Sequence, residues 1–223
     1  MPIFTANNTT KILPPNVDVI IEGRTICLMP ITENEINEQY LSWLNDPETN
    51  QFLEIRYKKQ TIADICDYIN GLRSSEGCEM FAVFSKKNNI HVGNIAVTHY
   101  NQNNQGIALY GALIGDHRAL MLGVGAEAEA LMIEFLFGNP KIRKIRANAH
   151  DENYKSWRLL ESLGFKREAV LRKEAVLPSS RICDVYLYGM LKEEWLKQRK
   201  KLPFLLRDIK IVDKRKTADA VKN

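Results

Sequence analysis

An apolar run, followed within ten residues by a glycine-rich turn, constrains the fold most. Residues Ile107 to Ile114 are nearly all apolar, which is typical of a strand in the interior of a sheet. Gly123-Val124-Gly125 comes next, and apolar residues then recur at helical spacing, at Ala128, Leu131, Met132, Phe135 and Leu136. Gly138-Asn139-Pro140 ends this amphipathic helix, and Ile142 to His150 is a second strand. The pattern predicts a strand–helix–strand unit with parallel strands.

The segments around this unit alternate between strands and capped helices. Strands are expected at Thr25 to Pro30, Met80 to Ser85, Val92 to Tyr100, Lys166 to Arg172 and Cys183 to Leu191. Two capping boxes mark helix starts, Thr32 with Glu35 and Thr61 with Asp64. Asp46-Pro47 ends the first of these helices. The whole predicts an α/β (mixed α+β) fold with a mostly antiparallel sheet flanked by helices.

Composition and charge limit the classes of protein. The chain has 223 residues, a formal charge of +4 and four scattered cysteines without a C-x-x-C pair, so we expect one main domain, reduced thiols and no metal site. Neither a signal peptide nor a transmembrane stretch is visible, which favours a cytoplasmic protein that does not bind membranes. Basic residues gather near the C-terminus without interleaved aromatics, so nucleic acid is not expected as a partner.

Three parts of the chain are distinguished by composition. Residues 1–20 are rich in Asn, Thr and Pro and are expected to be a flexible N-terminal segment. Residues 21–195 hold the alternating strands and helices of the predicted domain. Residues 196–223 form a basic extension, which we expect to be solvated.

The turn at Gly123 and Gly125 can bind phosphate. Free N–H groups at a helix start, together with the helix dipole, attract anions, and glycine lets the backbone approach closely. A tight structural turn that needs small residues is the alternative explanation. The turn lacks the third glycine of a dinucleotide-binding fingerprint and the Lys-Ser/Thr of a Walker A loop.

A second motif follows the second parallel strand. Asn153-Tyr154-Lys155-Ser156 leads into Leu163-Gly164-Phe165, which alone describes a helix capped by asparagine and ended by glycine. Together and in this order, the two motifs resemble those of the GNAT acetyltransferases, from about Thr25 to Trp195. The similarity is greatest to the ribosomal-protein N-terminal acetyltransferases and their small-amine relatives.

The resemblance implies a fold, a co-substrate and a set of binding residues. The sheet would splay to admit the pantetheine arm of acetyl-CoA. The residues implied to hold the cofactor are Leu113, Ile114, Leu122, Gly123, Val124, Gly125, Ala126 and Asn153. Leu120 departs from the family's usual Arg or Gln, and Leu160 stands where many relatives have a tyrosine acid.

Amine acetylation needs a base for the amine and stabilisation of the leaving thiolate. By resemblance, Ser156 is the candidate for the thiolate, although it could simply decorate its helix. Glu54 is the candidate base, with a surface ion pair as its alternative role. Other candidate bases are His99, His150 and Asp116, whereas His91 and His117 are expected to lie in loops.

The acceptor is the least constrained part of the function. Resemblance favours a small-molecule primary amine, in particular an amino sugar or a nucleotide-linked amino sugar, with Arg56, Lys58 and Lys59 near the diphosphate. The N-terminus of a ribosomal protein is the second hypothesis. A non-catalytic acyl-CoA-binding module is the third, and a homodimer is possible in each case.

Overall fold

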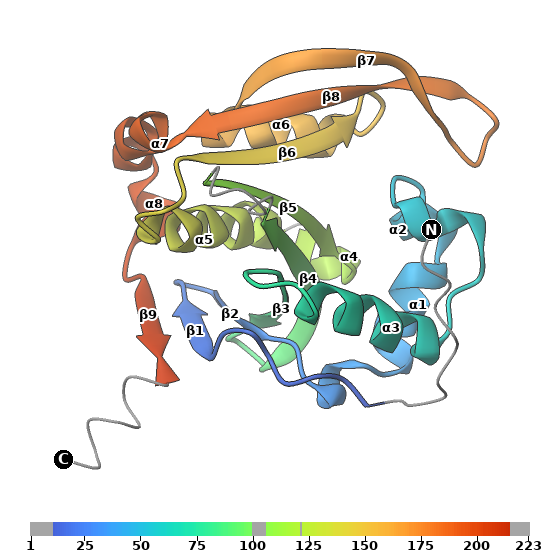
Figure 1. The fold of residues 1–223 in the computed structure, drawn as a ribbon, viewed down its shortest axis with the longest axis horizontal. Coiled ribbons are helices and arrows are strands. Elements are labelled where there is room, and N and C mark those ends of the chain that lie inside the picture. The colour runs from blue at the N-terminus through green and yellow to red at the C-terminus, as the bar shows by residue number, and fades with distance from the viewer. Residues whose placement is uncertain (1–10, 100–105, 121, 215–223) are drawn as a thin grey trace.

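The computed structural model describes residues 11–99, 106–120 and 122–214 (Figure 1). The predicted polar loop Asn101 to Gln105 lies outside them. Strands are β1 Val19–Glu22, β2 Ile26–Pro30, β3 Glu79–Ser85, β4 Ile90–His99, β5 Ile107–Ile114, β6 Lys144–His150, β7 Lys166–Val176, β8 Ile182–Leu191 and β9 Lys210–Asp213. Helices are α1 Glu38–Asn45, α2 Pro47–Asn50, α3 Ile62–Arg73, α4 His117–Leu120, α5 Val124–Gly138, α6 Tyr154–Leu163, α7 Lys192–Gln198 and α8 Pro203–Leu206. Short 3-10 helices are η1 Glu33–Glu35, η2 Glu54–Tyr57 and η3 Arg199–Lys201.

All nine strands form one sheet in the order β7-β8-β6-β5-β4-β3-β2-β1-β9. Strands β5 and β6 pair in parallel, and α5 connects them, whereas the other neighbours pair antiparallel. This arrangement confirms the predicted mixed sheet and its strand–helix–strand unit.

The sheet splays between β5 and β6. Their pairing is limited to three residue pairs at the start of both strands, and the last pair joins Leu109 to Arg146. From Tyr110 to Ile114, β5 pairs only with β4 among the described strands. From Ala147 to His150, β6 pairs only with β8. The two strands therefore leave facing backbone edges without a strand partner in the described part of the sheet, and we call the opening between them the cleft.

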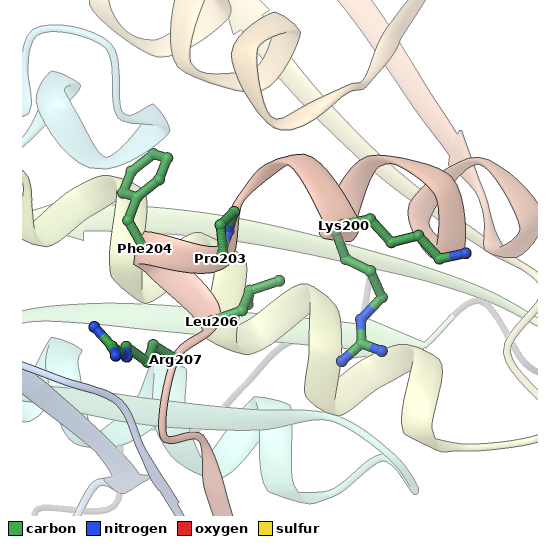
Figure 2. Close-up of a pocket in the computed structure, with 6 residues that line it drawn as sticks. Lys200, Pro203, Phe204, Leu206 and Arg207 are labelled. Atoms are coloured by element: carbon green, nitrogen blue, oxygen red, sulfur yellow. The ribbon is translucent and has the colours of Figure 1, made fainter.

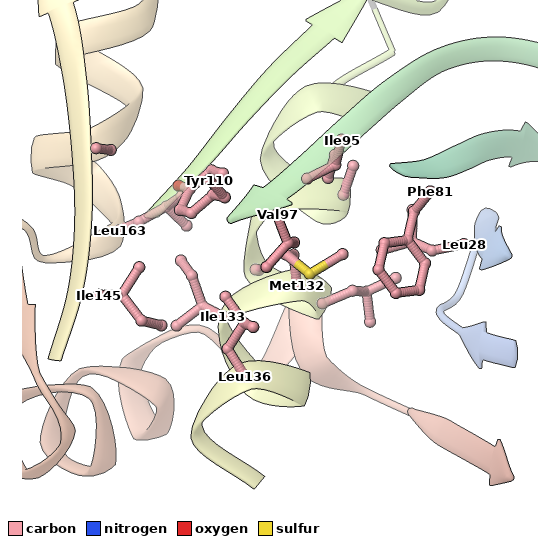
Figure 3. Close-up of a cluster of buried hydrophobic side chains, with 14 of the residues drawn as sticks. Leu28, Phe81, Ile95, Val97, Tyr110, Met132, Ile133, Leu136, Ile145 and Leu163 are labelled. Carbon is pink, nitrogen blue, oxygen red and sulfur yellow. The ribbon is translucent and has the colours of Figure 1, made fainter. Parts of the chain in front are cut away.

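Helices cover both faces of the sheet. Side chains alternate along β3, so that Phe81 and Val83 belong to one buried cluster and Met80 and Ala82 to the other. The larger cluster lies between the sheet and α5, with Met132, Ile133 and Leu136 packed against strand side chains (Figure 3). The smaller cluster lies under α1 and α3. No helix in the described ranges has the length and apolar content that a membrane span requires.

Local capping explains where the helices begin. The predicted boxes at Thr32 and Thr61 are both present. The first, however, opens only the short η1. A new helix, α1, then starts because the side chain of Asn37 accepts from the N–H groups of Gln39 and Tyr40. Asp46 ends α1 and caps α2, with Pro47 as its first residue.

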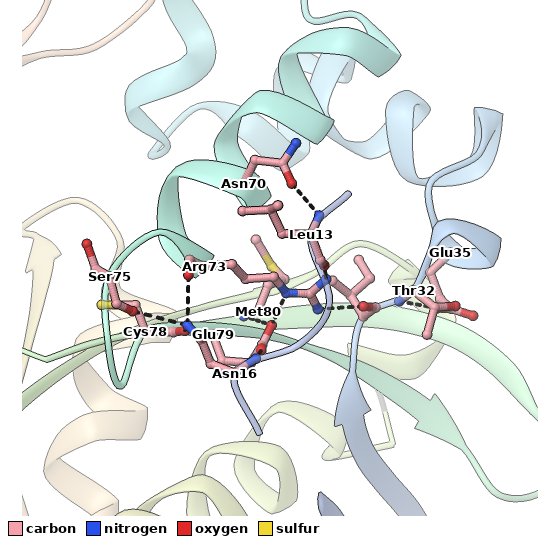
Figure 4. A network of polar contacts seen from close by, with 11 residues as sticks. Leu13, Asn16, Thr32, Glu35, Asn70, Arg73, Ser75, Cys78, Glu79 and Met80 are labelled. Atoms are coloured by element: carbon pink, nitrogen blue, oxygen red, sulfur yellow. Dashed lines mark hydrogen bonds and ion pairs between the residues drawn. The ribbon is translucent and has the colours of Figure 1, made fainter. Parts of the chain in front are cut away.

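The N-terminal segment is held in place, contrary to the expectation of flexibility for residues 11–20. Ile12 is buried, and the Asn16 amide donates to the backbone oxygens of Arg73, Ser75 and Cys78 (Figure 4). The buried Arg73–Glu79 ion pair, at 2.8 Å, also contacts this segment: Arg73 donates to the Leu13 carbonyl and Glu79 accepts from Asn16 N–H. These partners lie about 60 residues away in sequence, so no local pattern reveals them.

The C-terminal extension also packs on the domain. Leu202 and Leu205 are buried against the larger cluster, and β9 pairs with β1 at the edge of the sheet. The expectation of a solvated extension is therefore wrong for residues 196–214. As a result α5 is buried almost all round, rather than amphipathic as predicted, because α8 covers a face that would otherwise be exposed.

Candidate active site

The glycine turn lies at the N-terminus of α5, beside the cleft. Gly123 is the N-cap and has a left-handed φ of 74°, a conformation that favours glycine, and Leu122 is 77% exposed. The N-cap has no side-chain hydrogen bond, so the N–H groups of Val124, Gly125 and Ala126 begin the helix without intrahelical partners. A Cβ atom at Gly125 would lie 3.6 Å from Ile114, which is ordinary contact. The turn can therefore receive an anion on its backbone.

Leu113 and Ile114 end β5, and the short helix α4 separates them from this turn in the sequence. They pair with Asn94 and Gly93 of β4 on one side, and both are half-buried. On the other side their edge faces the splay, where backbone groups are available to an extended ligand. The end of this strand edge lies next to the turn in space, because a Cβ atom at Gly125 would lie 3.6 Å from Ile114. The role of these residues in holding the cofactor stays a prediction.

Asn153 and Ser156 lie at the start of α6, the helix that follows β6. The Asn153 side chain accepts from the Ser156 N–H at 3.3 Å, which confirms the predicted cap. The Ser156 hydroxyl has no hydrogen-bond partner among the described residues and is half-buried. Leu160, one turn further along, is buried and apolar. Ser156 thus offers on the first turn of α6 a hydroxyl that no described residue engages. The side chain of Leu120 lies outside the described part of the chain.

The open end of the cleft is defined by His150, the last residue of β6. His150 is 9% exposed, and the centroid of its ring lies 5.6 Å from that of Phe52. Burial lowers the pKa of His150, and the charge of Arg56 lowers it further, whereas Glu54, Asp151 and Glu152 act in the opposite direction. The neutral imidazole is therefore favoured at neutral pH.

Glu54 and Arg56 come from η2, next to this histidine. The Glu54 side chain is 81% exposed and lies 3.4 Å from Arg56, whose side chain is only 1% exposed. Arg56 and Tyr57 both donate to the Val176 carbonyl at the tip of the β7–β8 hairpin. This link, between segments about 120 residues apart, was not expected from the sequence. The role of Glu54 as base stays a prediction.

The basic residues expected near a diphosphate are not grouped. Arg56 points inward, as described, and Lys58 binds Asp64 at 2.6 Å. Lys59 is exposed. The alternative site residues are also dispersed. Asp116 forms an exposed ion pair with Arg118, and the His99 side chain lies outside the described part of the chain.

The two histidines expected in loops lie in regular structure. His91 is buried in β4, where its Nε2 lies 2.9 Å from the Gly93 carbonyl and its ring packs against Trp43. His117 opens α4 and lies 3.2 Å from Thr49. The loop expectation is wrong, because β4 starts earlier and the turn after β5 winds into a short helix.

Other hollows lie away from the cleft. One, of about 620 Å³, lies beside η3 and α8 and is lined by Arg199, Lys200, Pro203, Phe204, Leu206 and Arg207 (Figure 2). A second, of about 520 Å³, lies between α1, α2 and α4. Within the described residues, no three His, Cys, Asp or Glu side chains are grouped to hold a metal ion.

Comparison with known proteins identifies the family. The profile of the acetyltransferase (GNAT) domain matches residues 25–166. An uncharacterised N-acetyltransferase of Bacillus licheniformis is 27% identical over 176 residues, which cover 78% of this chain and 96% of the relative. The structure of Vibrio cholerae spermidine N-acetyltransferase, solved with CoA and spermine, has a TM-score of 0.67 at 16% identity, covering 77% of this chain and 98% of that one. A ribosomal-protein-S5-alanine acetyltransferase from Vibrio fischeri has a TM-score of 0.66 at 16% identity, covering 80% and 99%. The splayed sheet, the glycine turn and these matches together place the chain in the GNAT family of acetyltransferases.

Proposed function

We propose that this acyltransferase moves the acetyl group of acetyl-CoA to the primary amine of a small molecule. The observation that supports the donor most is that the unpaired β5 edge ends next to the bare N-terminus of α5, where a Cβ atom at Gly125 would lie 3.6 Å from Ile114. A pantetheine arm would pair with the edge at Leu113 and Ile114. The pyrophosphate would accept hydrogen bonds from N–H groups of the turn from Leu122 to Ala126.

Ser156 is proposed to stabilise the departing thiolate. Its hydroxyl lies on the first turn of α6, and the Asn153 cap positions that turn. The carboxamide nitrogen of Asn153 remains available to the cofactor arm, because the cap uses the oxygen. A hydroxyl donating to a developing thiolate acts mainly in the transition state, where it contributes most to rate.

An amino sugar is the proposed acceptor, and the diphosphate part of the earlier hypothesis has little support. The open end of the cleft is lined by polar groups and Phe52, a combination that suits a polyhydroxylated amine. Arg56 donates to the Val176 carbonyl and Lys58 pairs with Asp64, so neither side chain is available for a diphosphate. A free amino sugar therefore fits better than a nucleotide-linked one. Peptide N-termini are the second candidate, in line with the structural similarity to the enzyme that acts on ribosomal protein S5.

The test has two stages. Acetyl-CoA at about 100 times its Kd should stabilise the fold by about 2.7 kcal/mol, seen as a higher Tm. Release of CoA thiol is then followed with amino sugars, nucleotide-linked amino sugars, polyamines and N-terminal peptides as separate pools. Binding without release above the acceptor-free rate would support the non-catalytic module instead. An unchanged Tm would exclude acetyl-CoA as the ligand.

The role of Ser156 is tested with a matched pair of variants on α6. Ser156→Ala should lower kcat and kcat/KM together by roughly 10- to 100-fold, the loss of about 1–3 kcal/mol of hydrogen bonding. Ser162→Ala is the control, because the Ser162 hydroxyl donates to the Leu159 carbonyl at 2.7 Å on the exposed side. Equal rates for the two variants would remove Ser156 from the mechanism.

A further inference from the structure

Buried polar atoms without partners gather at the open end of the cleft. Within the described residues, six such atoms occur, and four of them belong to this region: Arg56 Nε, His150 Nε2, Asp151 Oδ1 and Glu152 Oε1. Glu152 Oε1 lies 2.5 Å from Arg181 in an ion pair, which leaves three. Buried polar atoms nearly always have a hydrogen-bond partner, so these three atoms leave hydrogen-bonding capacity unused at this place.

His150 is the member of this group that can change its protonation state near neutral pH. It is nine-tenths buried, and its Nε2 can accept a proton only in the neutral form that its surroundings favour. Glu54, the other candidate, is 81% exposed, so water competes for its carboxylate. A base held in a water-poor site, with its ring fixed against Phe52, is better positioned for proton transfer.

We propose that His150 is the general base of acetyl transfer, acting through Nε2 at the end of β6. The inference rests on the proposed function. The acceptor ammonium gives one proton to Nε2, and its freed lone pair forms the N–C bond at the thioester carbonyl. The C–S bond breaks, and the electron pair leaves on sulfur beside Ser156. The thiolate takes the second nitrogen proton, which yields the amide and CoA thiol, and His150 releases its proton to water.

The charged groups around the imidazole fix the expected pH behaviour. Those that face it come from η2 and from the turn after β6, and they are Glu54, Arg56, Asp151 and Glu152. As the pH is lowered and the imidazole becomes protonated, kcat/KM should fall. We call this fall the acid limb of the pH profile. Because the Glu54 carboxylate raises the pKa of His150, Glu54→Gln should move this acid limb to lower pH without removing it.

The decisive measurement is kcat/KM between about pH 5 and 9, which reports groups of the free enzyme. The full chain is used with the acceptor found by thiol release. His150→Gln should lower kcat/KM by about 100-fold or more at neutral pH and abolish the acid limb. Added imidazole should partly restore the rate of His150→Ala. Glu54→Gln is the matched control. An unchanged limb in His150→Gln, or its loss in Glu54→Gln, would overturn the proposal.

The unmodified enzyme gives a second readout that does not depend on the folding of a variant. With two acceptors whose ammonium pKa values differ, a limb that belongs to His150 stays at the same pH. The pKa read from that limb should change with temperature as the pKa of an imidazole does, which is more steeply than that of a carboxylate. A pKa with the weak temperature dependence of a carboxylate would exclude His150. Thiol release with no His150 dependence would refute only this proposal, whereas absence of any release would refute the proposed function itself.

Discussion

At the scale of single residues, Glu129 shows how the core holds a carboxyl group. It lies on α5, is buried, and accepts a hydrogen bond from the Tyr110 hydroxyl at 2.8 Å. Burial raises the pKa of Glu129 to about 7, and the hydrogen bond from Tyr110 acts against this rise. Tyr110 is the first residue of β5 beyond its pairing with β6, so the pair lies under the base of the splay.

Glu129 should therefore make stability depend on pH. Its pKa is higher in the folded chain than in the unfolded one, so the native state binds the proton more tightly. Stability is fully present below the unfolded pKa, near 4.5, and falls as pH rises through about 7. The loss amounts to roughly 3 kcal/mol. Glu129→Gln, which cannot ionise, should flatten this slope in urea unfolding followed between these pH values.

Tyr110→Phe provides the opposing control. It removes the hydrogen bond that lowers the pKa of Glu129, so the loss of stability should move to higher pH. If Glu129→Gln unfolds with the same pH slope as the parent chain, the carboxyl does not titrate in this window.

At the scale of elements, the turn and α5 combine two requirements in a few residues. Gly123 supplies the left-handed conformation, whereas Gly125 is helical, and a Cβ atom there would be in ordinary contact with Ile114 and Leu159. Further along α5, Glu134 accepts from the Trp195 indole and from Arg199. The helix is thus fixed at its far end by the C-terminal segment while its first turn stays bare.

Gly125→Val tests the function of that bare turn. The new Cβ has room, but the β-branched side chain would occupy the approach to the N–H groups. CoA affinity should fall more than about tenfold, with little change in far-ultraviolet circular dichroism. Gly71→Val, in α3 with free space and far from the turn, is the matched control. Similar affinities for both variants would show that the turn has only a structural role.

The sequence predicted elements with strong local signals and missed those that depend on distant partners. The strand Ile107–Ile114, the cap at Asn153 and the C-cap at Gly164, with φ of 101°, are confirmed. The four-residue strands β1 and β9 pair with each other at the edge of the sheet. Each is too short for its sequence to show the alternation of apolar and polar residues that predicts a strand. Likewise, the inward position of Arg56 depends on a hairpin tip that only the fold brings near.

At the scale of the molecule, the C-terminal segment completes the domain. Residues beyond Trp195 cover α5 through Leu202 and Leu205 and protect the β1 edge through β9 (Figure 1). An uncovered sheet edge exposes unpaired backbone groups that invite association between chains.

Truncation before Leu202 should therefore destabilise the fold and promote association. Losing the burial of two leucines costs roughly 3–6 kcal/mol, and the Tm should fall accordingly. Leu202→Ala/Leu205→Ala, which keeps β9, should lower the Tm but leave the chain monodisperse in light scattering if the parent chain is. Equal Tm values for the truncated and parent chains would contradict this role of the extension.

The pairing of β9 with β1 also imposes an order in time on the nascent chain. The ribosome releases β1 early, and its partner follows only after almost the whole domain has been made. At about 5–20 residues per second, the β1 edge remains uncovered for about 10–40 seconds, and the face of α5 that α8 covers for a shorter time. During that interval both surfaces are accessible to chaperones and to other chains, and the docking of residues 202–213 ends the exposure.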